Sequence, residues 1–157
     1  MTRLPIEIYT DGASKGNPGP GGYGVILRSG EHYKELSQGY KRTTNNRMEL
    51  LAVIVALEAL KRPNSDVDIY SDSKYVVDAV NKGWVFNWEK KGFAKKLNPD
   101  LWMRFLKVYK IHNVTFHWVK GHADHPENER CDALAVEAAE KAMTIPGYGL
   151  TDYEYEG

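Results

Sequence analysis

Ile8-Tyr9-Thr10-Asp11 and Ile69-Tyr70-Ser71-Asp72 repeat one pattern in two distant parts of the chain. Side chains alternate along each stretch with the period of a β-strand, and an Asp stands at the end. If the two strands are parallel neighbours, both carboxylates arrive at the same edge of one sheet. Ligands of open α/β sheets commonly bind beyond the carboxyl ends of the strands. The repeat therefore favours an α/β fold and indicates where a site would lie.

The rest of the chain extends this pattern into a complete domain. The periodicity predicts strands at 4–11, 22–28, 32–40, 67–71 and 114–119. It predicts helices at 44–60, 73–81, 99–110 and 126–143, with a glycine-rich loop at 12–22 and an irregular or partly helical stretch at 83–98. This order predicts a five-stranded mixed sheet flanked by helices. We expect one domain over 1–143 and a mobile C-terminal tail over 144–157.

Length and composition exclude several classes of protein. The chain has 157 residues and a single cysteine, Cys131, so it has no internal disulfide framework. It contains no apolar run long enough for a membrane span and begins without the apolar run of a signal peptide. We therefore expect a cytoplasmic monomer with no membrane contact and no obligate protein partner.

The charge is balanced in total but is unevenly distributed. The chain holds 21 Lys and Arg against 21 Asp and Glu. Residues 82–110 hold eight basic and two acidic side chains, whereas 124–157 hold two basic and nine acidic ones. Trp84, Phe86 and Trp88 lie within the basic stretch, and lysines interleaved with aromatic rings are typical of nucleic-acid surfaces. The same rings could equally belong to the core, so composition alone leaves both readings open.

Two further acids could join Asp11 and Asp72. Glu49 begins the helix predicted at 44–60, and Asp132 lies early in the helix predicted at 126–143. A cluster of carboxylates suits Mg²⁺ or Mn²⁺ better than Zn²⁺. Each of the two acids also has an ordinary structural explanation. Glu49 could form a capping pair with Asn46, and Asp132 could favour its helix N-terminus.

The motifs of the chain together resemble bacterial ribonuclease H, type 1. The matching blocks follow in order along nearly the whole chain, from about residue 5 to 143. They are Asp11-Gly12, Gly16 to Gly22, Thr43-Thr44-Asn45-Asn46-Arg47-Met48-Glu49, Asp72-Ser73, Trp118-Val119-Lys120-Gly121-His122 and Asn128-Glu129-Arg130-Cys131-Asp132.

This resemblance implies the ribonuclease H-like fold and a metal-dependent endonuclease that hydrolyses the RNA strand of RNA–DNA hybrids. It implies four catalytic and metal-binding acids: Asp11, Glu49, Asp72 and Asp132. Two Mg²⁺ ions, for which Mn²⁺ can substitute, would activate water and stabilise the leaving oxygen. The products would carry 5′-phosphate and 3′-hydroxyl ends. His122 matches the family's loop histidine, a candidate for carrying protons or assisting product release.

The resemblance also implies how a hybrid is recognised. Residues near the RNA strand, where 2′-hydroxyls can be bound, would be Asn17, Asn45, Asn46 and Lys74. Those near the DNA strand would be Arg42, Thr44, Tyr75, Trp84, Trp88 and Asn98. Lys90, Lys91, Lys95 and Lys96 would form a basic protrusion, and we expect Trp102 in the core. The segment between Trp88 and Trp102 is shorter than in the best-known bacterial members, and Phe93 stands where a third Trp is common.

Two other functions are compatible with these motifs. A non-catalytic module that binds hybrids or duplex RNA could share the fold, although loss of one acid would be its usual sign. A strand-transfer nuclease could share the sheet and the metal chemistry, although 157 residues leave no room for its usual extra DNA-binding domains.

Overall fold

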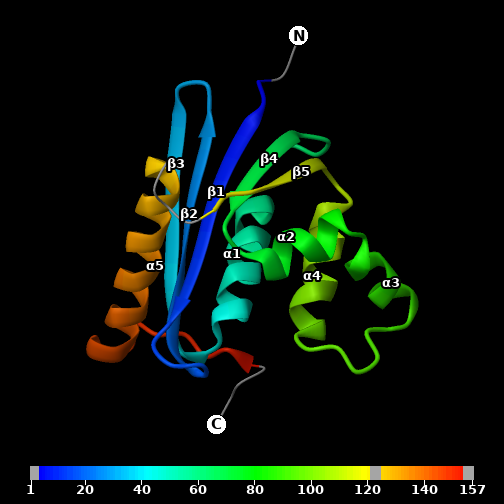
Figure 1. Ribbon diagram of the computed structural model, residues 1–157. Helices are drawn as coiled ribbons and strands as arrows, with labels where there is room; N and C mark the ends of the chain where they lie inside the picture. The colour runs from blue at the N-terminus through cyan, green and yellow to red at the C-terminus, as the bar shows by residue number, and fades with distance from the viewer. Residues whose placement is uncertain (1–3, 121–124, 154–157) are drawn as a thin grey trace.

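A single mixed β-sheet forms the centre of the molecule (Figure 1). The computed structural model describes residues 4–120 and 125–153. The five strands are β1 (Ile6–Ser14), β2 (Gly19–Ser29), β3 (His32–Thr43), β4 (Asp66–Ser71) and β5 (Asn113–Trp118). Their order across the sheet is β3-β2-β1-β4-β5. The first three strands pair antiparallel, whereas β4 runs parallel to both β1 and β5, which confirms the predicted mixed sheet.

Helices cover both faces of this sheet (Figure 1). They are α1 (Asn45–Glu58), α2 (Lys74–Asn81), α3 (Trp84–Lys90), α4 (Pro99–Tyr109) and α5 (Pro126–Thr144). Two consecutive glycines of β2 identify the two faces: Gly22 approaches Ala138 of α5, whereas Gly21 approaches Met48 of α1. None of the helices within 4–120 and 125–153 has the length and apolar content needed to cross a membrane.

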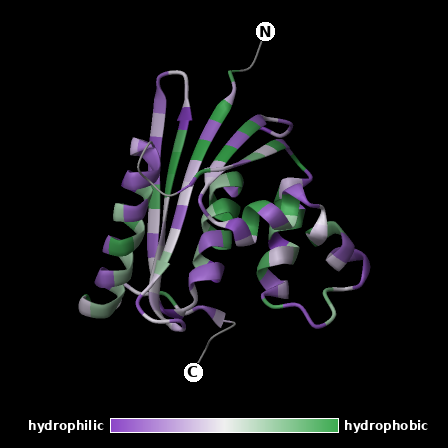
Figure 2. Cartoon of the chain, viewed as in Figure 1, coloured by the Kyte–Doolittle hydropathy of each residue, from purple (hydrophilic) through white to green (hydrophobic). Residues whose placement is uncertain are grey.

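The main core lies on the α1 face of the sheet. Helix α1 is buried along nearly its whole length because the sheet covers one side of it and α4 packs on another. Hydrophobic residues accordingly gather in α1, whereas α3 and the turn after it mix hydrophobic and hydrophilic residues (Figure 2). Trp102 of α4 is fully buried in this core, as the sequence predicts.

Strand β1 is longer than predicted, and its length places the first Asp of the repeat at a fork. The strand continues to Ser14 because it stays paired with β2 as far as Gly21. Its pairing with β4 stops at Tyr9 and Tyr70, so the two parallel strands part just before Asp11. The repeated Asp residues therefore stand where the sheet opens.

The N-terminus of α1 differs from the predicted capping pair. Thr44 is the N-cap, and its hydroxyl accepts a hydrogen bond from the backbone N–H of Arg47 at 3.3 Å. Asn46 already lies inside the first turn, so Glu49 is not its capping partner. Because Thr44 supplies the cap, the carboxylate of Glu49 can point elsewhere.

Residues 145–152, which belong to the tail predicted to be mobile, fold back onto the domain in the structure. Leu150 pairs with the β3 backbone: its N–H donates to the carbonyl of Gly39 at 3.0 Å, and its carbonyl accepts from the N–H of Lys41 at 2.9 Å. Asp152 follows and is buried. The acidic, glycine-containing composition of this segment is typical of a mobile tail. Composition could not show that one of its acids, Asp152, binds a buried residue of the domain.

Candidate active site

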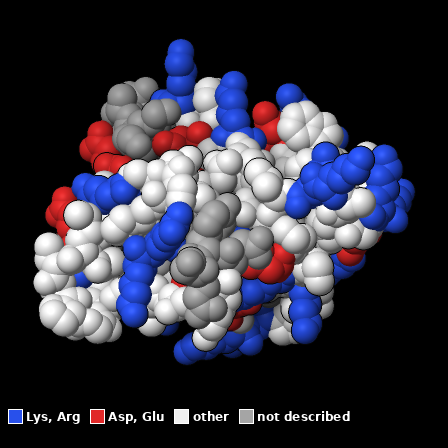
Figure 3. Space-filling model, turned by 90° about the horizontal axis from the view of Figure 1, so that it is seen from below, with Lys and Arg blue, Asp and Glu red and all other residues white. Residues whose placement is uncertain are grey.

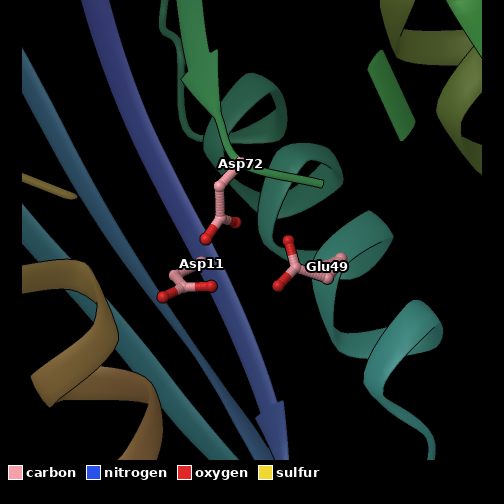
Figure 4. A group of neighbouring side chains, drawn as sticks. All are labelled: Asp11, Glu49 and Asp72. Carbon is pink, nitrogen blue, oxygen red and sulfur yellow. The ribbon is translucent and has the colours of Figure 1, made fainter. Parts of the chain in front are cut away.

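Three acidic side chains from separate parts of the sequence meet at the fork between β1 and β4. Asp11 comes from β1, Glu49 from α1, and Asp72 directly follows β4. Carboxylate oxygens from all three lie within 4.8 Å of one another. Figure 4 shows the three carboxylates turned toward a common point. The structure thus brings together the repeated Asp pair and the helix acid that the sequence singled out.

A glycine holds the first two acids together. The backbone N–H of Gly12 donates to Oδ1 of Asp11 at 2.9 Å and to Oε1 of Glu49 at 3.0 Å. A Cβ at this position would collide with backbone atoms of Glu49 and Met48. Only glycine allows β1 to approach α1 this closely, so the Asp11-Gly12 pair has a direct geometric reason.

The backbone around Asp72 is held from two sides. The indole N–H of Trp118, at the end of β5, donates to the carbonyl of Asp72 at 3.2 Å. The hydroxyl of Ser73 caps α2 by accepting from the N–H of Val76 at 3.3 Å. A strand end and a helix start therefore fix the backbone that carries this carboxylate.

Helix α5 brings Asp132 to the same cavity. The thiol of Cys131 lies 3.2 Å from the carbonyl of Tyr9, and the side-chain amide of Asn128 donates to the carbonyl of Tyr70 at 3.3 Å. The two carbonyls stand two residues before Asp11 and Asp72, respectively. Asp132 lines the cavity but lies outside the tight group of three acids.

Crowding of the acids changes the protonation of Glu49. Burial raises the pKa of Glu49 well above its ordinary value, and the neighbouring charges of Asp11 and Asp72 raise it further. Its Oε2 atom is buried and receives no hydrogen bond from the described residues. A divalent cation would reduce the repulsion between the carboxylates and would give Oε2 of Glu49 a partner. A set of ligands that are all oxygen atoms suits Mg²⁺ or Mn²⁺.

The acids line an open cavity of about 470 Å³. Among the predicted RNA-facing residues, Asn45, Asn46 and Lys74 also line it, and so does Tyr75 from the predicted DNA-facing group. Asn17 lies outside the lining, but its Oδ1 accepts a hydrogen bond from the backbone N–H of Asn45 at 3.1 Å. Asn17 therefore connects the loop before β2 to the start of α1.

The other predicted DNA-facing residues are not among those that line the cavity. Trp84 and Trp88 belong to α3, where Trp84 is exposed and Trp88 packs edge-on against Trp102. Arg42 is exposed near the end of β3 and is followed closely by Thr44, the cap of α1. Asn98 is buried, so its amide is held by protein partners.

The predicted basic protrusion is exposed at the end of α3 and in the turn after it. Its members are Lys90, Lys91, Lys95 and Lys96. Seen from below, Lys and Arg side chains gather at this end of the molecule, on the right in Figure 3. The ammonium of Lys96 lies 5.1 Å from the ring centre of Trp88, which joins this basic patch to the aromatic one. His122 lies outside the described residues.

Sequence reasoning missed one buried charge beside this site. Arg47 stands inside the Thr43–Glu49 block but was given no role, and its side chain is almost completely buried. A charged residue among the apolar positions of a helix was the available signal. Its partner Asp152 gave no signal, because it lies more than a hundred residues away in the chain.

Comparisons with known proteins agree with this geometry. Residues 4–140 match the family model for RNase H. A ribonuclease H of Desulforamulus reducens is 59% identical over 141 residues, which cover 87% of this chain and 88% of that protein. A ribonuclease H of Syntrophus aciditrophicus is 59% identical over 150 residues, covering 91% of this chain and 86% of that protein.

Solved structures of similar fold also include RNase H proteins. The crystal structure of LC9-RNase H1, a type 1 RNase H, superimposes with a TM-score of 0.81 at 32% identity, covering 97% of this chain and 79% of that one. LC11-RNase H1 in complex with an RNA/DNA hybrid superimposes with a TM-score of 0.62 at 29% identity, covering 88% of this chain and 99% of that one. The fold and the acidic site define a hydrolase of the endoribonuclease class. The chain belongs to the RNase H family.

Proposed function

We propose that this protein hydrolyses the RNA strand of RNA–DNA hybrids with the help of divalent metal ions. The observation that carries the proposal is the group of Asp11, Glu49 and Asp72, whose carboxylate oxygens lie within 4.8 Å of one another in an open cavity. The hybrid bound to LC11-RNase H1, a relative of similar fold, supports the choice of substrate.

The residues present fit two Mg²⁺ ions, for which Mn²⁺ could substitute. Asp11, Glu49 and Asp72 would supply ligands, and Asp132 would contribute a further carboxylate from the lining of the same cavity. At such a site, two ions supply activation of a water molecule and stabilisation of the leaving 3′ oxygen, which gives 5′-phosphate and 3′-hydroxyl products. Glu49 would lose its proton when the ions bind, since ligand carboxylates must be ionised. His122 remains our candidate for moving protons near this site.

Discrimination between the two strands would come from residues on either side of the acids. Asn45 and Asn46 can both donate to and accept from a 2′-hydroxyl, which only RNA has. Asn17 would support Asn45 through its hydrogen bond, and Lys74 would reach an RNA backbone oxygen. We infer that this group of residues meets the RNA strand in its minor groove.

The DNA strand would lie along the exposed aromatic and basic surface. Trp84, Trp88 and Tyr75 would contact deoxyribose, where an added 2′-hydroxyl would fit poorly. Arg42, Thr44 and Asn98 would surround one DNA phosphate. Lysines of the basic protrusion would meet further phosphates without reading sequence. Because one chain supplies every one of these groups, we infer that the protein works as a monomer.

A panel of matched substrates tests this function. Oligonucleotides of one sequence are supplied as RNA–DNA hybrid, RNA duplex, DNA duplex and single-stranded RNA, each with Mg²⁺ or Mn²⁺. We expect cleavage of the hybrid alone. Binding without cleavage in either metal would identify a non-catalytic module instead, and joining or nicking of DNA ends would identify a strand-transfer nuclease.

A further inference from the structure

Arg47 is the most deeply buried charged side chain next to the proposed substrate cavity. It belongs to α1, where Asn46 precedes it and Glu49 follows two residues later. Its exposed fraction is 1%. Burial of a guanidinium is energetically unfavourable unless all of its N–H groups find acceptors. The partners of Arg47 are therefore expected to surround it closely.

Two carboxylates and one amide surround this guanidinium. Asp152 accepts from Nε and Nη2, both at 2.7 Å. Asp100, in the first turn of α4, accepts from Nη1 at 2.9 Å and from Nη2 at 2.7 Å. Oδ1 of Asn98 accepts from Nη1 at 3.1 Å. These contacts supply one acceptor for each N–H of the guanidinium.

The same network continues to the wall of the cavity. The Nδ2 group of Asn98 donates to the hydroxyl of Tyr75 at 3.0 Å, and the indole of Trp102 donates to the same hydroxyl at 2.9 Å. Tyr75 lines the cavity that contains the acids. An unbroken chain of hydrogen bonds therefore joins Asp152, Arg47, Asn98 and Tyr75.

Asp152 is itself held in place by β3. Backbone hydrogen bonds of Leu150 with Gly39 and Lys41 align the C-terminal segment with that strand. The hydroxyl of Thr43, the last residue of β3, donates to Oδ2 of Asp152 at 2.6 Å. The carboxylate of Asp152 is thus held in a fixed orientation by the residue that directly precedes Thr44, the N-cap of α1.

We propose that Asp152 is a positioning residue for substrate binding, which acts through Arg47 to hold Asn98 and Tyr75 against the hybrid. A neutral amide in place of the Asp152 carboxylate leaves the guanidinium with one acceptor fewer and with a donor facing its N–H groups, so the guanidinium turns toward Asp100. The Oδ1 atom of Asn98 then no longer receives a hydrogen bond from a guanidinium in a fixed position. As a result, the Nδ2 group of Asn98 no longer holds the Tyr75 hydroxyl in place. The acids themselves are held by other contacts, so Asp152 affects binding more than the chemical step. This inference rests on the proposed function.

The test is the variant Asp152→Asn, which keeps the side-chain shape but removes the charge. With full-length protein, Mg²⁺ and a labelled RNA–DNA hybrid, well below the unfolding temperature, we expect KM to rise about 5- to 20-fold and kcat to change less than about twofold. The dissociation constant for the hybrid in EDTA, measured by fluorescence polarisation, is expected to rise by a similar factor.

Two control variants separate positioning from general stability. Glu58→Gln breaks an exposed ion pair with Arg104 at 2.6 Å, which joins α1 to α4 and does not line the cavity. Ile54→Val creates a small void in the buried part of α1. Both are expected to keep the KM of the unaltered protein, although Ile54→Val lowers the unfolding temperature.

The milder variant Thr43→Val removes only the hydroxyl that orients Asp152. We expect a smaller rise in KM in the same direction, and this variant decides the matter if Asp152→Asn does not fold. An unchanged KM, an equal loss in kcat, or the same rise in KM for Ile54→Val would overturn the positioning role. If the unaltered protein leaves the hybrid uncut, the proposed function fails instead, and the two failures are thereby distinguished.

Discussion

Glu49 shows how one residue acquires its role from its neighbours. In the sequence it could equally be a capping residue or a metal ligand. The structure gives the cap to Thr44, and the N–H of Gly12 holds Glu49 beside Asp11. Burial and two neighbouring carboxylates then raise its pKa. These features are typical of a cation-binding site. They are not those of a residue that caps a helix.

The raised pKa of Glu49 predicts a pH dependence of stability in the metal-free protein. An unfolded Glu titrates near about 4.3, so the folded protein holds a proton on Glu49 at higher pH than the unfolded chain does. The resulting contribution to the free energy of unfolding is present at low pH and is lost as pH rises through the raised pKa. In urea titrations with EDTA, Glu49→Gln is therefore expected to gain stability over the unaltered protein as pH rises from about 4 to 8.

Addition of Mg²⁺ should cancel much of that difference. Cations stabilise the ionised form of Glu49 and bind the folded state alone, so they raise the unfolding temperature of the unaltered protein more than that of Glu49→Gln. A constant stability difference across the pH range, with no response to Mg²⁺, would contradict this account of Glu49.

Asp11 provides a second prediction at the residue scale. Asp11→Asn keeps the shape of the side chain but removes the charge of a metal ligand. Loss of a group that only hydrogen-bonds to a metal ligand lowers activity by up to about 100-fold. For Asp11 itself, we therefore expect hybrid cleavage to fall by more than that factor. Cleavage rate and circular dichroism are measured together. Asp68→Asn is the matched control, because Asp68 lies on β4 but pairs with His117 outside the cavity. Near-normal activity of Asp11→Asn would remove Asp11 from the site.

At the scale of elements, the close approach of β1 and α1 determines the geometry of the acids. Alternation and helical period predicted both elements. The Asp repeat could bring its carboxylates together only if β1 and β4 were parallel neighbours, and the structure meets that condition. Neither pattern predicted that β1 would continue to Ser14, because that extension depends on its partner β2. The fork that separates Asp11 from Asp72 is therefore a property of pairing, which no single strand encodes.

Gly12→Ala tests this approach directly. The added methyl group would collide with the α1 backbone, at a cost of about 1–3 kcal/mol, and would push Glu49 away from Asp11. We expect lower stability together with a severe loss of cleavage, measured by urea unfolding and hybrid hydrolysis.

The control for this change is Gly30→Ala. Gly30 has a φ of 59° in the turn between β2 and β3, and the added Cβ would meet only the end of the Leu4 side chain. Backbone strain of about 1–2 kcal/mol should lower stability to a comparable degree while cleavage is retained. Equal losses of cleavage in both variants would mean that stability, rather than the position of Glu49, limits activity.

At the scale of the whole molecule, the distribution of charge and the C-terminal segment were the hardest features to predict. A balanced total of 21 basic and 21 acidic residues concealed a basic end formed by α3 and the turn after it. The segment 145–152 was predicted to be mobile, yet Asp152 packs against Arg47. The strand repeat pointed to Asp11 and Asp72, and the resemblance to a known family added Glu49 and Asp132, because all four lie in short local motifs. Such motifs could not predict the Arg47–Asp152 contact, since only the finished fold brings these two residues together.

The basic end gives the prediction that belongs to this scale. Replacement of Lys90, Lys91, Lys95 and Lys96 by Gln should raise KM for the hybrid and leave kcat nearly unchanged, because phosphate contacts add binding without taking part in the reaction. The slope of log KM against log salt should shrink by about 0.7–0.9 for each lost phosphate contact.

A second set of four exposed basic residues serves as the comparison. Gln at Lys34, Lys61, Arg62 and Lys107 removes the same charge from elsewhere on the surface. An identical salt slope for both sets would show that only net charge matters and that the basic protrusion is a solvated face.

The most direct measurement follows each strand of one RNA–DNA hybrid separately, with the RNA and the DNA carrying different end labels. In Mg²⁺, the unaltered protein is expected to shorten the RNA label and leave the DNA label at full length, while Glu49→Gln leaves both intact. A full-length RNA label with the unaltered protein, a cut DNA strand, or undiminished cleavage by Glu49→Gln would contradict hydrolysis of the RNA strand at this acidic site.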